Sequence, residues 1–179
     1  MVDRLFLVGM MGAGKTTVGQ VLADRLGWPH LDSDGQVAQA TGRSIPEIFA
    51  ERGEEAFRAE EAKALTRAAT SATPVVVSVA GGAVLDPENR RLLGRSGSVV
   101  WLRARVDTLA ARVGSGDGRP LLDHDPAAAL RHLEAQRRPM YQQLAQLVVD
   151  VDDLPPTLVA ERILAGLDRL SPCIQEGGP

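Results

Sequence analysis

The sequence has one cysteine, few aromatic side chains and no long hydrophobic run. The lone Cys173 cannot form a disulfide within the chain, so a disulfide-stabilised framework is excluded. Aromatic residues make up only 3% of the chain, too few for the base-stacking surfaces of single-strand nucleic-acid binders. Every apolar run falls short of the roughly 20 residues that a membrane-spanning helix needs, and the first residues lack the features of a secretory signal. We therefore expect a cytoplasmic protein with no membrane partner.

Charges of the two signs nearly balance, with 20 basic and 23 acidic residues and a net charge of −3. The basic residues are spread along the chain, so nucleic acid is not an expected partner. A length of 179 residues fits one domain, and 44% hydrophobic residues are typical of a globular protein. We predict a single domain over residues 1–170, followed by a disordered tail over residues 171–179, and a monomer.

Short apolar runs alternate with helical patterns along the chain. Four runs rich in valine and leucine predict parallel strands buried on both faces, at residues 5–8, 75–79, 99–102 and 147–149. A weaker fifth candidate covers residues 28–31. Helix starts are predicted by three caps, which are Ser44 with Glu47, Asp86 before Pro87, and Asp125 before Pro126. Strands that alternate with helices predict an α/β fold whose ligands bind beyond the carboxyl ends of the strands.

A phosphate-binding motif follows the first predicted strand. Residues 9–16 read GMMGAGKT, which matches G-x-x-x-x-G-K-[ST] between a strand and a helix. In such a loop the backbone N–H groups face phosphate oxygens, the lysine reaches the terminal phosphates, and the hydroxyl can bind Mg²⁺. The predicted ATP-binding residues of this segment are Gly12, Ala13, Gly14, Lys15, Thr16 and Thr17.

Two aspartates follow the second predicted strand, and each has two interpretations. Asp32 is a candidate for the Mg²⁺ site together with Thr16, but it could instead cap the next helix. Asp34 could accept the proton of a phosphoryl acceptor, although it too could be a helix cap.

Three arginines are candidates for binding anions. Arg58 lies between Glu54 and Glu61 at helical spacing, which also fits a solvated ion-paired surface. Arg137 precedes Pro139, which we expect to end or kink a helix that begins near Asp125. Arg119 follows the glycine-rich segment 114–118, which could close over a nucleotide or be an ordinary surface loop.

Together these residues resemble the shikimate kinases, small members of the nucleoside monophosphate kinase structural family. The resemblance runs from about residue 5 to residue 167, and its most specific elements are Asp34, Phe57-Arg58, Gly81-Gly82 and Arg137-x-Pro139-x-Tyr141. It implies a three-layer α/β sandwich with a five-stranded parallel sheet of order 2-3-1-4-5, the P-loop kinase fold, and a flexible lid. It also implies transfer of the γ-phosphate of ATP to the 3-hydroxyl of shikimate in the presence of Mg²⁺.

The resemblance implies a role for each candidate residue. Asp34 would hold the acceptor hydroxyls and act as the base, with Lys15 and Arg119 as the other catalytic residues. The substrate-binding residues would be Asp34, Arg58, Gly81, Gly82 and Arg137, of which the two arginines would bind the shikimate carboxylate. On the nucleotide side, Arg119 would reach the phosphates from the lid and Arg112 would lie beside the adenine.

The sequence departs from the family pattern at three places and leaves two other functions open. Ala80 replaces the first of three glycines, and the segment 150–156 is acidic where relatives often carry a basic residue. The segment between Ala68 and Pro74 is one residue longer than in some relatives, a change that a surface loop should tolerate. The alternatives are a kinase for another small acceptor, such as gluconate or a nucleoside monophosphate, and a nucleotide-binding switch without an acceptor. The pair of Arg58 and Arg137 argues against a pocket that reads a base, because forked guanidinium groups suit a carboxylate.

Overall fold

A five-stranded parallel sheet forms the centre of the computed structural model, which describes residues 4–114 and 125–170. The strands are β1 (Arg4–Val8), β2 (His30–Asp32), β3 (Val75–Ser78), β4 (Ser98–Arg103) and β5 (Leu147–Asp150). Their order is β2-β3-β1-β4-β5, and every pair is parallel. The predicted fold class and strand order are confirmed, although β2 begins at His30 and not at residue 28.

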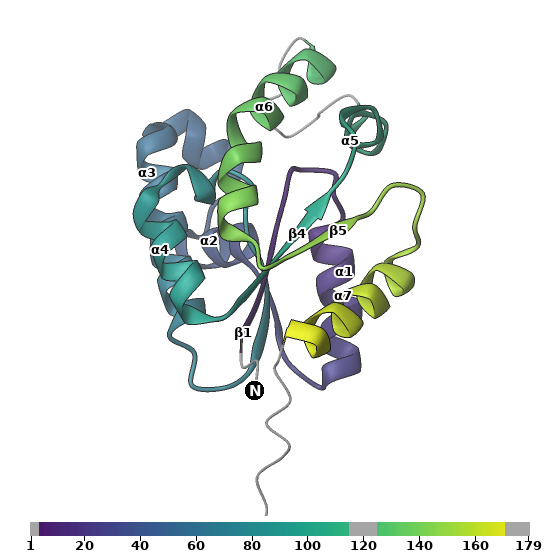
Figure 1. Ribbon diagram of the computed structural model, residues 1–179. Coiled ribbons are helices and arrows are strands. Elements are labelled where there is room, and N and C mark those ends of the chain that lie inside the picture. The colour runs from purple at the N-terminus through teal and green to yellow at the C-terminus, as the bar shows by residue number, and fades with distance from the viewer. Residues whose placement is uncertain (1–3, 115–124, 171–179) are drawn as a thin grey trace, which may run out of the picture.

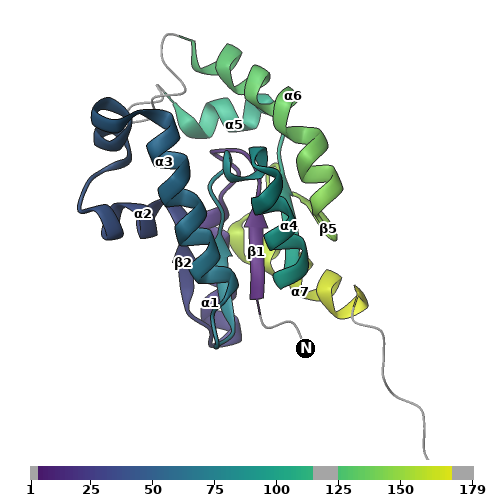
Figure 2. The same ribbon diagram turned by 90° about the vertical axis from the view of Figure 1, so that its left-hand side faces the viewer.

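Helices cover both faces of this sheet, so the molecule has three layers (Figure 1). One face carries α1 (Lys15–Leu26) and α7 (Pro156–Leu170), and the other carries α3 (Ile45–Ala69), α4 (Pro87–Ser96) and α6 (Pro126–Leu144). Helix α2 (Ser33–Thr41) packs against α3, and α5 (Val106–Val113) packs against α6 beyond the carboxyl ends of the strands (Figure 2). A short 3-10 helix, η1 (Ala83–Leu85), follows β3. None of the helices in these two ranges is long and apolar enough to span a membrane.

Three predictions fall outside the described residues. They concern Arg119, the lid at residues 115–118 and the tail at residues 171–179, which includes Cys173.

Local sequence signals place the helix ends where they were predicted. Ser44 and Glu47 form a full capping box at the start of α3, in which the Ser44 N–H donates to the Glu47 carboxylate at 2.7 Å. Asp86 and Asp125 accept hydrogen bonds from backbone N–H groups of the first turns of α4 and α6. Gly27 ends α1 in a left-handed conformation, with φ of 66°. These caps satisfy backbone groups that a helix end otherwise leaves unpaired.

Two helices differ from the sequence-based expectation. Helix α6 does not end at Pro139 but continues to Leu144, because the buried side chains of Arg137 and Tyr141 hold its second half against the protein. Helix α3 contains a break at Gly53, whose φ of 78° and ψ of 174° are not helical.

The core lies on both sides of β1, the central strand. Leu5, Phe6 and Leu7 are fully buried, as are Val76 of β3 and Val100 of β4. Because both faces of these strands are covered, the strands read as continuous apolar runs and not as alternating patterns. The polar side chains that follow the strands consequently meet at one edge of the sheet.

Two glycines in helix interiors should respond in opposite ways to alanine. A Cβ at Gly19 in α1 would lie 2.5 Å from Nε2 of His30 and 2.9 Å from Oγ of Ser78, so Gly19→Ala should lower the free energy of unfolding by about 1–3 kcal/mol. A Cβ at Gly94 in α4 would meet only Leu144, at 3.7 Å, so Gly94→Ala should raise stability by about 0.5–1 kcal/mol. Urea unfolding of the two variants measures both effects, and equal stabilisation would show that the Gly19 contact is not tight.

Candidate active site

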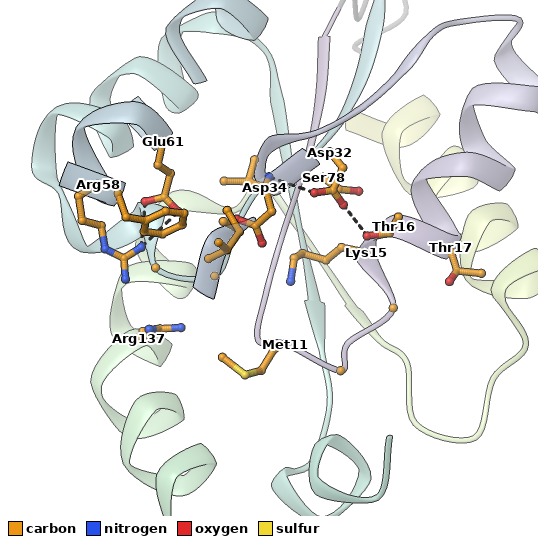
Figure 3. A pocket seen from close by; sticks show the side chains of 18 of the residues that line it. Met11, Lys15, Thr16, Thr17, Asp32, Asp34, Arg58, Glu61, Ser78 and Arg137 are labelled. Carbon is orange, nitrogen blue, oxygen red and sulfur yellow. Dashed lines mark hydrogen bonds and ion pairs between the residues drawn. The ribbon is translucent and has the colours of Figure 1, made fainter. Parts of the chain in front are cut away.

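A cavity of about 560 Å³ opens at the carboxyl edge of the sheet, bounded by the phosphate loop, α2, α3 and α6 (Figure 3). The predicted site residues that line it are Gly12, Gly14, Lys15, Thr16, Thr17, Asp32, Asp34, Arg58, Gly81, Gly82, Arg112 and Arg137. Ala13 belongs to the same loop, but its side chain is buried in the core. The structure thus brings together side chains from distant parts of the chain.

The phosphate loop has the backbone geometry that its glycines predict. Gly12 and Gly14 have φ of 83° and 89°, values that side chains disfavour, and α1 begins directly after Gly14. The Lys15 ammonium donates to the carbonyls of Gly9 at 2.9 Å and Met10 at 3.0 Å, so it lies across the loop. An anion bound here would meet the helix N-terminus and a positive charge.

Asp32 combines the two roles that the sequence left open. Its Oδ1 accepts hydrogen bonds from the N–H groups of Asp34 and Gly35 at 3.1 and 3.3 Å, which makes it the cap of α2. Its Oδ2 accepts from the Thr16 hydroxyl at 2.6 Å. A carboxylate and a hydroxyl oxygen beside the phosphate loop are the ligand types that Mg²⁺ takes, so these two residues fit the predicted metal site.

Asp34 is not the cap of α2, because Asp32 occupies that position. Asp34 lies in the first turn of α2, and Figure 3 shows its carboxylate between Lys15 on one side and the Arg58–Glu61 pair on the other. Of its two predicted interpretations, only the one that directs the side chain into the cavity agrees with this geometry.

Arg58 makes the ion pairs that its spacing predicts, but only the pair with Glu54 lies at the solvated surface. Its guanidinium lies 2.9 Å from Glu54 and 2.9 Å from Glu61, and the Glu61 side chain is only 1% exposed. Burial opposes the charge of Arg58, but the two carboxylates outweigh it and raise the Arg58 pKa. For Glu61, burial dominates over the attraction of Arg58 and raises the pKa to about 7.

Arg137 is one of the most deeply buried side chains, with 1% exposure. Its Nε atom has no hydrogen-bond partner in the described part of the chain. Burial, and the like charge of Arg58, lower its pKa. A buried guanidinium group that is incompletely paired is costly unless an anion completes it, so this part of the cavity suits a small anionic ligand.

An apolar wall beside the arginines was not predicted from the residues alone. Ile45, Phe49 and Phe57 line the cavity, and the rings of Phe49 and Phe57 lie 4.9 Å apart. The Arg58 guanidinium stands over the Phe57 ring at 5.1 Å. From the sequence, Phe49 and Phe57 stood out only as part of a family pattern. Their spacing alone is equally typical of core positions in a helix.

The acidic segment after β5 is tied to α5. The Asp152 carboxylate accepts from the Thr108 hydroxyl at 2.5 Å and from the Arg105 N–H at 3.1 Å. Arg112 donates to the carbonyls of Val151 at 3.0 Å and Gly12 at 3.4 Å, and so joins this segment to the phosphate loop. A second hollow beside these contacts is lined by Asp107, Thr108, Ala111, Arg112, Asp153 and Leu154. The carboxylate of Asp152 therefore holds this segment against the start of α5.

Comparisons with known proteins identify relatives of this chain. Residues 11–168 match the family model described as shikimate kinase. The shikimate kinase of Pseudomonas syringae pv. tomato is 43% identical over 170 residues, which cover 94% of this chain and 98% of the relative. The structure of shikimate kinase from Acinetobacter baumannii in complex with shikimate is 35% identical, with a TM-score of 0.93 and 96% coverage of both chains. A gluconokinase from Sinorhizobium meliloti 1021 has a TM-score of 0.64 at 23% identity and shares the fold alone.

Replacing Glu61 by glutamine should change how stability depends on pH. The folded state raises the Glu61 pKa from its ordinary 4.5 to about 7, so it keeps a proton that the unfolded chain has released. This contribution stabilises the folded protein at pH values below the Glu61 pKa of the unfolded chain. It is lost as the pH rises through the Glu61 pKa of the folded state. Relative to Glu61→Gln, the wild-type free energy of unfolding should fall by up to about 3 kcal/mol between about pH 4 and pH 8.

Urea unfolding at several pH values measures this difference. Glu60→Gln is the matched control, because Glu60 is the preceding carboxylate and its hydrogen bond to Lys63 lowers its pKa, so its own transition lies at the acid end. Parallel pH profiles of the wild type and Glu61→Gln would contradict the raised pKa of Glu61.

Proposed function

Since the chain belongs to the shikimate kinase family, we propose how its cavity carries out the ATP-dependent phosphorylation of shikimate and which residues take part. The enzyme is a phosphotransferase that uses ATP and acts in aromatic biosynthesis. The observation that carries the assignment of residues is the incompletely paired, buried Arg137 beside Arg58, in the same cavity as Asp34 and the phosphate loop.

On the acceptor side, Arg58 and Arg137 bind the shikimate carboxylate. Two guanidinium forks can each donate to a planar carboxylate, and low exposure strengthens these charge-assisted bonds. Gly81 and Gly82 add backbone N–H groups to the same part of the cavity. The apolar wall of Ile45, Phe49 and Phe57 covers the carbon face of the ring.

Asp34 directs the reacting hydroxyl. Its carboxylate accepts the hydrogen bond of the 3-hydroxyl and takes the proton as that oxygen attacks the γ-phosphorus in line. The bond from the γ-phosphorus to the bridging oxygen breaks, and ADP leaves. Lys15 stabilises the charge on the phosphate oxygens during transfer, so catalysis consists of positioning and electrostatic stabilisation.

On the nucleotide side, residues 12–17 bind the phosphates and Arg112 lies beside the base, in the hollow that α5 and the Asp152 segment form. Thr16 and Asp32 would hold Mg²⁺, which when bound neutralises phosphate charge. The role of Arg119 at the phosphates stays a prediction, since that residue lies outside the described part of the chain. We also expect the enzyme to be a monomer and to work in the cytoplasm, where ATP is supplied.

The direct test is ADP release from Mg²⁺-ATP with shikimate, gluconate or a nucleoside monophosphate as acceptor. Shikimate alone should stimulate release strongly, and Lys15→Ala should abolish the stimulation. Stimulation by gluconate would show that the protein is a kinase with a different acceptor. ADP release that does not depend on any acceptor would favour a nucleotide switch.

Replacing Arg137 by methionine should chiefly raise the KM for shikimate. The change keeps much of the side-chain volume but removes a charge-assisted contact worth about 1.5–3 kcal/mol, which corresponds to about a 10- to 150-fold higher KM. The KM for ATP should stay close to that of the wild type. Steady-state kinetics with each substrate varied in turn measure both values.

Arg138→Met is the matched control for this change. Arg138 is the next residue of α6, but its side chain is 46% exposed and pairs with Glu134. This variant should keep the wild-type KM for shikimate. If both variants behave alike, the carboxylate is bound elsewhere.

Replacing Asp32 by asparagine should separate its two roles. Asparagine caps helices about as well as aspartate, so the stability of the protein should change little. The lost carboxylate charge should raise the Mg²⁺ concentration for half-maximal activity by roughly 10-fold or more. Mg²⁺ titration of activity tests this, with Asp86→Asn at the cap of α4 as control, and an unchanged Mg²⁺ requirement would restrict Asp32 to capping.

A further inference from the structure

The only tyrosine of the sequence lies behind the acceptor side of the cavity. Tyr141 is 1% exposed and follows Arg137 by one turn of α6, so both side chains point toward the same side of the sheet. Its hydroxyl donates a hydrogen bond to the carbonyl oxygen of Gly81 at 2.8 Å. A phenylalanine would fill nearly the same space, so packing alone does not account for the hydroxyl group at this position.

This hydrogen bond fixes the orientation of one peptide unit in the cavity wall. The carbonyl of Gly81 and the N–H of Gly82 belong to the same peptide, and no peptide bond in the described residues is cis. In a planar trans peptide these two groups point in opposite directions. With its carbonyl held by Tyr141, the peptide directs the Gly82 N–H away from the tyrosine.

The surroundings leave this peptide little freedom. A Cβ at Gly81 would lie 3.2 Å from an Arg137 nitrogen and 3.2 Å from the Gly9 carbonyl, and a Cβ at Gly82 would collide with the Arg58 guanidinium. The preceding residue is held from the other side, because the N–H of Ala80 donates to Oγ of Ser33 at 2.8 Å. The turn therefore lies between the two arginines and the phosphate loop.

We propose that Tyr141 is a positioning residue for the acceptor, which holds the Gly81–Gly82 peptide so that its N–H donates to shikimate between Arg58 and Arg137. This proposal rests on the proposed function and adds to it a residue that does not touch the substrate. Burial raises the Tyr141 pKa, so the hydroxyl stays protonated and remains a donor.

The test is Tyr141→Phe, which removes the hydroxyl and keeps the ring. The KM for shikimate should rise by about 3- to 10-fold, as expected for the loss of one neutral hydrogen bond, while the KM for ATP stays unchanged. The control is Trp101→Phe. Trp101 stacks on the Tyr141 ring with 5.6 Å between ring centroids, so this substitution reduces packing around Tyr141 but leaves its hydrogen bond to Gly81 in place. This control should lower the thermal midpoint but leave the KM for shikimate at the wild-type value.

An unchanged KM for shikimate in Tyr141→Phe, with an active wild type, would overturn the proposal and leave the function intact. Equal changes of both KM values and of stability in the two variants would also overturn it, since they indicate a merely structural role. A wild type that releases no ADP in response to shikimate would instead overturn the function on which the proposal rests.

A second readout does not depend on activity. Because the chain has one tyrosine, protein labelled with 3-fluorotyrosine gives a single ¹⁹F resonance. Shikimate without nucleotide should shift this resonance in the wild type, and the shift should persist in Trp101→Phe. A resonance that shikimate does not move, in protein that binds shikimate by calorimetry, would contradict a link between Tyr141 and the acceptor.

Discussion

The buried carboxylate of Glu61 allows two arginines to share one wall of the cavity. Arg58 and Arg137 carry like charges, and burial together with the charge of Arg58 lowers the pKa of Arg137. Glu61 lies on the same helix as Arg58 and partly neutralises that guanidinium, although burial raises the pKa of Glu61 itself. Without a negative charge at this position, the anionic ligand would have to hold the two cations together by itself. The acceptor side of the site therefore depends on an ion pair that is built before the ligand arrives.

On the phosphate side of the cavity, the single carboxylate of Asp32 makes two different contacts. One of its oxygens caps α2 and the other contacts Thr16, so the start of α2 is aligned with the phosphate loop. This alignment also sets the place of Asp34, two residues later in the first turn of the helix. The candidate base is consequently positioned between the two halves of the cavity by the residue that also fits the metal site.

Much of the fold and of the site could be predicted from the sequence because the relevant signals are local. Capping residues such as Ser44 and Asp86 act within one helical turn, and strands buried on both faces show as uninterrupted valine and leucine runs. The phosphate loop is local as well. Residues that follow parallel strands meet at one edge of the sheet. For this reason the sequence predicts that Asp34, after β2, and the Gly81–Gly82 turn, after β3, lie close together.

Other features could not be predicted because they depend on contacts between distant segments. The spacing of Glu54, Arg58 and Glu61 is the same for a solvated helix face and for a buried ion pair, and only the packing of α3 against the rest of the protein distinguishes them. The residues alone left Arg137 and Arg58 open for this reason. Resemblance to a family favours anion-binding roles for both arginines, and the burial of Glu61 shows physically why its pair with Arg58 differs from a solvated one.

The path of α6 through Pro139 shows how tertiary contacts override a local preference. Proline removes one backbone hydrogen bond from the helix and favours an end or a kink. Here the residues on either side are anchored, since Arg137 faces the cavity and Tyr141 is held by Gly81 and the Trp101 ring. A helix that ended at Pro139 would separate these two side chains. The continued helix instead keeps the buried Arg137 and the Tyr141 side chain behind the glycine turn in fixed register, so one element positions both side chains at this wall of the cavity.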